Sequence, residues 1–202
     1  MTRLTAFIVF CIGLTHLTEA AAHKAKIARK VMATAKAQSG ELHLHVLLWQ
    51  HHAGLRSKRI IAQFDLDGSK TFNQAESLLA GDALSAEVIG RFVVFLDGES
   101  WLPKSAEAKS IRLDEKTVET AVLLTYSAPL KQSFSLRFSL HPKSKQHARK
   151  LDLTTLAPLI ITAGEQAASV SRSHQLTPKK TVDFEIRFDP FTWLERLQLK
   201  PF

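Results

Sequence analysis

One short acidic segment, residues 65–76, holds the side chains of this chain that are best suited to chemistry. Oxygen-bearing side chains stand at its first, third, fifth, ninth and twelfth positions, and Phe72 stands at the eighth. Hard divalent cations bind oxygen ligands, and donors at such short offsets can converge on one ion. The spacing therefore predicts cation binding by the following side chains: Asp65, Asp67, Ser69, Asn73 and Glu76.

The segment resembles an EF-hand calcium loop, and the resemblance extends over roughly residues 55–84. It implies calcium as the bound ion, a backbone carbonyl ligand at the seventh position and a bidentate carboxylate at the twelfth. Carried over to this sequence, the implied ligands are Asp65, Asp67, Ser69, the Thr71 carbonyl, Asn73 and Glu76.

Two departures from the EF-hand pattern predict weak binding. The sixth position, where the family has a glycine with positive φ, is Lys70. A side chain in that conformation costs about 1 kcal/mol, and the ammonium group repels a cation. Ser69 replaces a carboxylate, so only three ligands carry negative charge. An affinity of about 10⁻⁴–10⁻³ M follows, which fits a structural role outside the cell better than calcium sensing.

A simpler interpretation of the same segment is a helix–turn–helix connector without an ion. Asp67-Gly68 is a turn sequence, and Asn73 is a good N-cap residue with Glu76 three positions later, as in a capping box. The sequence leaves both interpretations open.

Histidines suggest a second kind of metal site. His43 and His45 alternate with apolar residues of a predicted strand and so share one face, and His51 follows closely. Histidines spaced in this way can chelate zinc, copper or nickel. The alternative function is therefore an accessory protein that handles a transition metal through His43, His45 and His51.

No catalytic motif is present. The chain has no Gly-x-Ser-x-Gly elbow, no phosphate loop and no dinucleotide fingerprint. We therefore predict a non-enzymatic protein of structural or adaptor role, which leaves room for an unidentified protein partner.

Hydrophobic patterning predicts the elements that must position these residues. Helical spacing favours a helix over 55–64 and a second helix that begins near Asn73, with a bend or early end at Gly81. Alternating or apolar runs predict strands over 41–49, 92–96, 110–113, 118–126, 133–140, 158–162 and 182–188. The predicted fold is mainly β (α+β), an antiparallel β-sandwich with an EF-hand-like insertion at about 55–88, after the first strand.

The beginning of the chain indicates export. Residues 1–22 combine Arg3, an apolar stretch and a small-residue cleavage site, which together predict a signal peptide and a periplasmic or secreted protein. Residues 23–40 are predicted to be a basic leading arm or helix, and 41–202 a single domain. The lone Cys11 lies in the leader, so no disulfide and no membrane span are expected after cleavage.

The formal net charge of +8 is concentrated in two runs, residues 23–30 and 141–150. Neither run interleaves aromatic residues, as surfaces that bind single-stranded nucleic acid do. We therefore expect a solvated tail and a solvated loop, and no nucleic-acid binding. A short helix is predicted near the end, over 190–197.

Overall fold

The structure is a computed structural model that describes residues 30–89, 92–140, 149–163, 166–169, 171–177 and 180–189. The predicted signal peptide and the predicted helix at 190–197 lie outside the described residues. Within them, strands and helices follow one another in this order: β1 Lys30–Gln38, β2 Glu41–Ala53, α2 Leu55–Phe64, α3 Gln74–Ile89, β3 Phe92–Leu96, β4 Glu99–Trp101, β5 Ser105–Asp114, β6 Thr117–Pro129, β7 Ser133–Leu140, β8 Arg149–Thr155, β9 Leu159–Ala163, β10 Gln166–Ser169, β11 Ser171–Leu176 and β12 Val182–Phe188.

The strands form two six-stranded sheets. Sheet A has the order β11-β8-β1-β2-β6-β5, and sheet B has the order β10-β9-β12-β7-β3-β4. Neighbouring strands are antiparallel except β1 and β8, which are parallel. The fold is thus mainly β with some helix, in a sandwich-like arrangement, and this part of the prediction is confirmed.

The two sheets enclose an almost purely apolar core. Alternate residues of each strand point inward, as the period of two requires. Phe138 of β7 lies between Phe92 and Phe184, with ring centroids 5.9 and 5.8 Å away. On the facing sheet, Val122 and Leu124 of β6 are fully buried in the same cluster.

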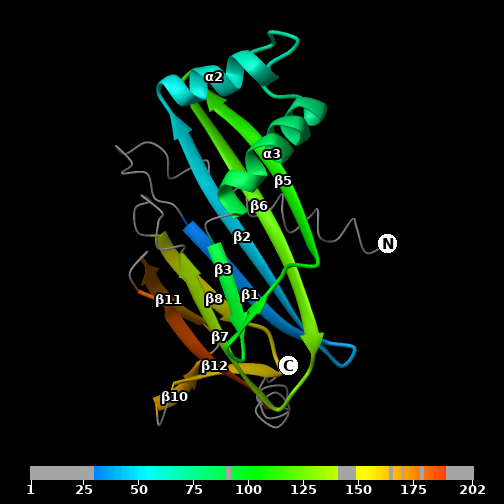
Figure 1. Ribbon diagram of the computed structural model, residues 1–202, viewed down its shortest axis with the longest axis vertical. Helices are drawn as coiled ribbons and strands as arrows, with labels where there is room; N and C mark the ends of the chain where they lie inside the picture. Colours follow the sequence, from blue (N-terminus) through cyan, green and yellow to red (C-terminus); the bar gives the residue numbers. More distant parts are fainter. Residues whose placement is uncertain are drawn as a thin grey trace, which may run out of the picture.

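The helices cover one end of sheet A. Strands β2, β5 and β6 extend beyond sheet B, and α2 and α3 lie across that extension (Figure 1). Val118 packs with Ile60, Phe64, Ala80 and Leu84 of the helices. Because Val118 and Val122 lie on the same face of β6, the helices cover the face that sheet B covers further along.

The start of the domain differs from the prediction. The predicted leading arm or helix at 23–40 is wrong for residues 30–38, which form strand β1. Alanine and lysine favour helix locally, but β1 pairs with β2 and β8, and Val31, Ala33 and Ala35 are buried in the core; this packing outweighs propensity. The helical insertion therefore follows the second strand. Ser39 and Gly40, both at positive φ, form the two-residue turn of the β1–β2 hairpin.

Two further local predictions are corrected. The basic run at 141–150 was expected to be a solvated loop, but Arg149 begins β8 and is fully buried. Helix α3 does not end at Gly81, because this glycine allows the helix to approach β5 closely. A Cβ there would lie 2.6 Å from backbone atoms of Ala108 and Lys109.

Candidate cation site

The acidic loop connects two helices that are anchored to sheet A. Helix α2 has the predicted bounds and buries Ile60 and Phe64. At its end, the Asp65 amide donates to the Ile61 carbonyl at 2.9 Å. The loop thus begins at a fixed helix end, and Asp65 is the first residue beyond it.

Three carboxylates of the loop meet at one place. One oxygen of each of Asp65, Asp67 and Glu76 lies within 4.8 Å of the corresponding oxygen of the other two. Of these side chains, Glu76 is buried and Asp67 is exposed. Like charges at this separation repel one another, so the cluster requires compensating positive charge or hydrogen-bond donors.

Glu76 is held by the backbone of its own loop. Its Oε2 accepts the Asn73 amide at 2.9 Å, and Asn73 Oδ1 accepts the Glu76 amide at 3.1 Å, which forms the predicted capping box. Its Oε1 accepts the amides of Leu66 and Asp67 at 2.6 and 3.2 Å. A carboxylate has about four lone-pair sites, so Glu76 keeps one for another ligand. Bidentate binding would require it to release a backbone donor.

Asp65 has a partner that the local sequence does not reveal. Its Oδ2 accepts from Arg112 Nη1 of β5 at 2.5 Å, and the two side chains are only 8% and 7% exposed. Its Oδ1 is buried and has no hydrogen-bond partner. Arg112 therefore neutralises one charge of the cluster, while one buried carboxylate oxygen remains free to accept.

Asp67 and the middle of the loop form a compact exposed turn. Asp67 Oδ1 accepts the Ser69 amide at 2.9 Å, and its Oδ2 accepts from the Asn73 side chain at 3.3 Å. Hydrogen bonds from the Ser69 side chain and backbone lower the pKa of Asp67, so this carboxylate is ionised at neutral pH. Ser69 Oγ donates to the Thr71 carbonyl at 2.9 Å, so these two predicted ligands contact each other.

The turn has the backbone strain that the sequence predicts. Gly68 has φ +66°, and Lys70 has φ +68°, in the left-handed region that disfavours a side chain. The Lys70 side chain is exposed, so its ammonium group can stay in solvent, away from the buried Glu76 carboxylate.

The predicted histidine ligands lie on one face of β2, and two of them are next to a carboxylate. His43 Nε2 lies 3.6 Å from Glu41, and His51 Nδ1 lies 3.5 Å from Glu119. Burial, Lys36 and His43 lower the pKa of His45. Across the described ranges, none of these three histidines belongs to a group of three metal-binding side chains.

A different histidine is buried beneath the helices, and the sequence analysis missed it. His52 Nε2 lies 3.1 Å from Thr120 Oγ1, which lies 2.9 Å from Ser110 Oγ. Ser77 Oγ of α3 donates to the Ser110 carbonyl at 2.6 Å. These bonds tie α3 to β5, β6 and β2. A signal was present in the sequence, since the inward positions of β2, apolar from Leu42 to Leu48, continue as Gln50 and His52.

Comparison with other proteins adds no assignment. Neither the models of protein families nor the curated proteins contain a match to this chain. Within the part of the chain that the structure describes, no helix is long and apolar enough to cross a membrane.

Proposed function

We propose that the loop at 65–76 binds one oxygen-ligated divalent cation, calcium in the first instance, and that the cation stabilises the helical end of a non-enzymatic structural or adaptor protein. The observation that carries the proposal is the buried, unpartnered Oδ1 of Asp65 beside two further carboxylates. An acceptor left in this state costs about 1–3 kcal/mol or more, which a bound cation would offset.

The lone pairs that remain free define the coordination that the loop can offer. Asp65 Oδ1 is free, Glu76 keeps one lone-pair site, and each oxygen of Asp67 accepts one hydrogen bond. Ser69 and the Thr71 carbonyl would have to exchange their mutual bond for the ion. Calcium takes six to eight oxygen ligands, so water would complete its shell. Such a site is weak and suits the calcium levels outside the cell.

The location of the cluster supports a structural role. Asp65 follows the last residue of α2, Glu76 lies in the first turn of α3, and Arg112 belongs to β5. An ion at Asp65 Oδ1 would therefore fix the two helices relative to the sheet. The predicted export to the periplasm or the outside is part of this proposal.

Calorimetric titration of the full chain with calcium tests the site. We expect wild type to bind calcium with a Kd of about 1 mM, and 5 mM calcium to raise stability by about 1 kcal/mol, or about 2–4 °C in Tm. Asp65→Asn should abolish both effects. The matched control is Asp82→Asn, which removes an exposed carboxylate of α3 outside the cluster and should leave both unchanged.

Arg112→Gln sharpens the test. Without the guanidinium, Asp65 is left buried and unpaired, so stability should fall by about 3–5 kcal/mol in the absence of calcium. Calcium should bind more tightly to this variant, by about tenfold, because a nearby positive charge has been removed. The control is Arg137→Gln, which breaks an exposed ion pair with Asp183 on sheet B. It should change neither the stability without calcium nor the calcium affinity by a comparable amount.

Two results would contradict the proposal. One is the absence of saturable calcium binding in wild type and in Arg112→Gln alike, which would favour the ion-free connector. The other is equal binding by Asp65→Asn and Asp82→Asn. A magnesium titration alongside asks whether calcium is preferred, since magnesium demands near-ideal octahedral geometry.

A further inference from the structure

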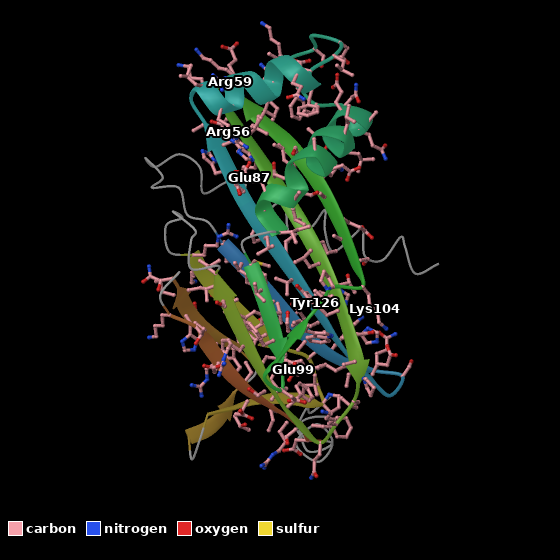
Figure 2. All side chains as sticks on the ribbon, viewed as in Figure 1. Arg56, Arg59, Glu87, Glu99, Lys104 and Tyr126 are labelled. Atoms are coloured by element: carbon pink, nitrogen blue, oxygen red, sulfur yellow. The ribbon has the colours of Figure 1, made fainter. Side chains whose placement is uncertain are left out.

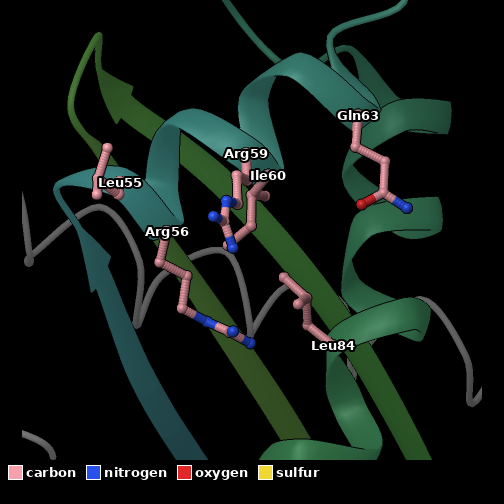
Figure 3. A pocket seen from close by; sticks show the side chains of 6 residues that line it. All are labelled: Leu55, Arg56, Arg59, Ile60, Gln63 and Leu84. Atoms are coloured by element: carbon pink, nitrogen blue, oxygen red, sulfur yellow. The ribbon is translucent and has the colours of Figure 1, made fainter.

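A cleft lies between α2 and α3, and the residues that line it are separate from the acidic loop at 65–76. Its volume is about 420 Å³, and it is lined by Leu55, Arg56, Arg59, Ile60, Gln63 and Leu84. Figure 3 shows that the Arg56 side chain extends from α2 toward Leu84 on α3. The volume falls within the range of about 300–1,000 Å³ that small-molecule sites occupy.

The two arginines of the cleft have different surroundings. Arg56 makes a short ion pair with Glu87 of α3, and its Nε donates to His52 Nδ1 at 3.4 Å, so it is held in place. Arg59 is exposed and has no ion pair or hydrogen bond within the described ranges. The cleft therefore has one fixed guanidinium and one that is free to bind an anion. A guanidinium presents its donors as a planar fork that matches a carboxylate.

The charge distribution along α2 also favours an anion. Arg56, Lys58 and Arg59 lie in its first half, and its first turn contains no acidic residue. The N-terminal end of a helix already carries partial positive charge, so cations there destabilise the helix slightly. This arrangement raises the positive potential at the cleft, where Glu87 is the carboxylate that pairs with Arg56.

The remaining lining is apolar. Ile60 and Leu84 are buried against Val118, and the Leu55 side chain is 77% exposed at the edge. An exposed leucine beside a free arginine can contact a ligand that has both an apolar and a charged part. Burial of apolar chain contributes about 0.8 kcal/mol for each CH₂ group.

We propose that this cleft binds a small amphipathic monocarboxylate, with its carboxylate on Arg59 and its apolar chain against Leu55, Ile60 and Leu84. Gln63 also lines the cleft, further along α2, and the apolar chain of the ligand would extend toward it. None of the residues that line the cleft belongs to the acidic loop, so its ligand would not compete with the cation for side chains.

The test uses the fluorescent fatty-acid analogue 11-(dansylamino)undecanoate with the full chain, in a chelator that removes calcium. We expect saturable binding to wild type with micromolar Kd, and about tenfold weaker binding to Arg59→Gln. The matched control is Lys58→Gln, which removes the adjacent exposed charge of α2 that does not line the cleft, and it should change Kd less than twofold. The methyl ester of the probe should bind wild type about as weakly as the acid binds Arg59→Gln.

Three outcomes would overturn the proposal. They are no saturable binding, equal weakening by Arg59→Gln and Lys58→Gln, and an ester that binds as tightly as the acid. As a second readout, the acid should shift the amide resonances of α2 and of Leu84. Shifts confined to the sandwich would also overturn it.

Discussion

The two ends of sheet A bury different kinds of side chain. Where sheet A faces sheet B, the interior is mostly aliphatic and aromatic, with Arg149 and Thr155 of β8 as buried polar exceptions, and burial raises the pKa of Tyr126. Where it faces the helices, the apolar cluster is small and buried polar groups accompany it: Gln50, His52, Ser57, Glu76, Ser77, Ser110 and Thr120. Figure 2 shows Arg56, Arg59 and Glu87 at the helical end and Tyr126 toward the sandwich end.

The difference shows how one sheet can serve two purposes. Apolar burial is non-directional and roughly proportional to area, so it makes the sandwich a stable frame. Hydrogen bonds between buried groups require fixed positions, and each broken bond leaves an unsatisfied partner. The helical end is therefore the part that a ligand can stabilise, and both proposed sites lie there. We expect it to open locally at lower free energy than the sandwich.

The largest effect should come from the sandwich core. Phe138→Ala removes a ring that packs between Phe92 and Phe184, and should lower the free energy of unfolding by about 3–5 kcal/mol. Denaturant titration measures this value. Leu102→Ala, at a side chain that is 77% exposed, is the control and should change it by less than about 0.5 kcal/mol. A loss below about 1 kcal/mol for Phe138→Ala would mean that the sandwich is not the main source of stability.

Gly81→Ala should separate the two ends. The added Cβ would lie 2.6 Å from the β5 backbone, so α3 must move away at a cost of about 1–3 kcal/mol. Hydrogen exchange should then quicken in α2 and α3 while sheet B keeps its protection. Alanine also raises helix propensity by about 1 kcal/mol, so a net stabilisation would contradict the close contact of α3 with β5.

An effect of similar size should come from the polar interior itself. Thr120→Val keeps the shape of the side chain but removes the hydroxyl between Ser110 and His52, at a cost of about 1–3 kcal/mol. Thr125→Val, on the other face of the same strand, serves as the control. Thermal unfolding distinguishes the two. Equal Tm values for the variants would show that the buried hydrogen bonds add no net stability.

Regular patterns in the sequence predicted many of the elements. The bounds of α2, β3, β7 and β12 match the prediction. Helix α2 and strands β7 and β12 have an uninterrupted period, and β3 is a short apolar run that ends before the turn at Asp97-Gly98. Strands β1 and β8 were missed because their alanines and basic residues indicate helix or loop locally. In the sheet, β1 pairs with β2 and β8, and β8 pairs with β1 and β11. The pairing of β1 with β8 joins Lys30 to Lys150, residues that no local window contains together.

In the candidate cation site, too, local features could be predicted from the sequence and a distant contact could not. The capping box at Asn73 and Glu76 and the positive φ of Lys70 could be predicted, since both depend on residues a few positions apart. The ion pair between Asp65 and Arg112 could not be predicted from the sequence. Arg112 lies 47 residues further along, and only the packing of α2 and α3 on β5 brings its guanidinium to the carboxylate.

By itself, the amino-acid sequence determined a mainly β chain, the helices on either side of an acidic loop, and the donors of that loop, because these follow from local periodicity and spacing. The tertiary structure decided which donors remain available. It buried Asp65 against Arg112, left one oxygen free and directed Glu76 to the backbone. Charge balance in a buried cluster depends on every group within a few ångströms, and residues distant in sequence supply some of those groups.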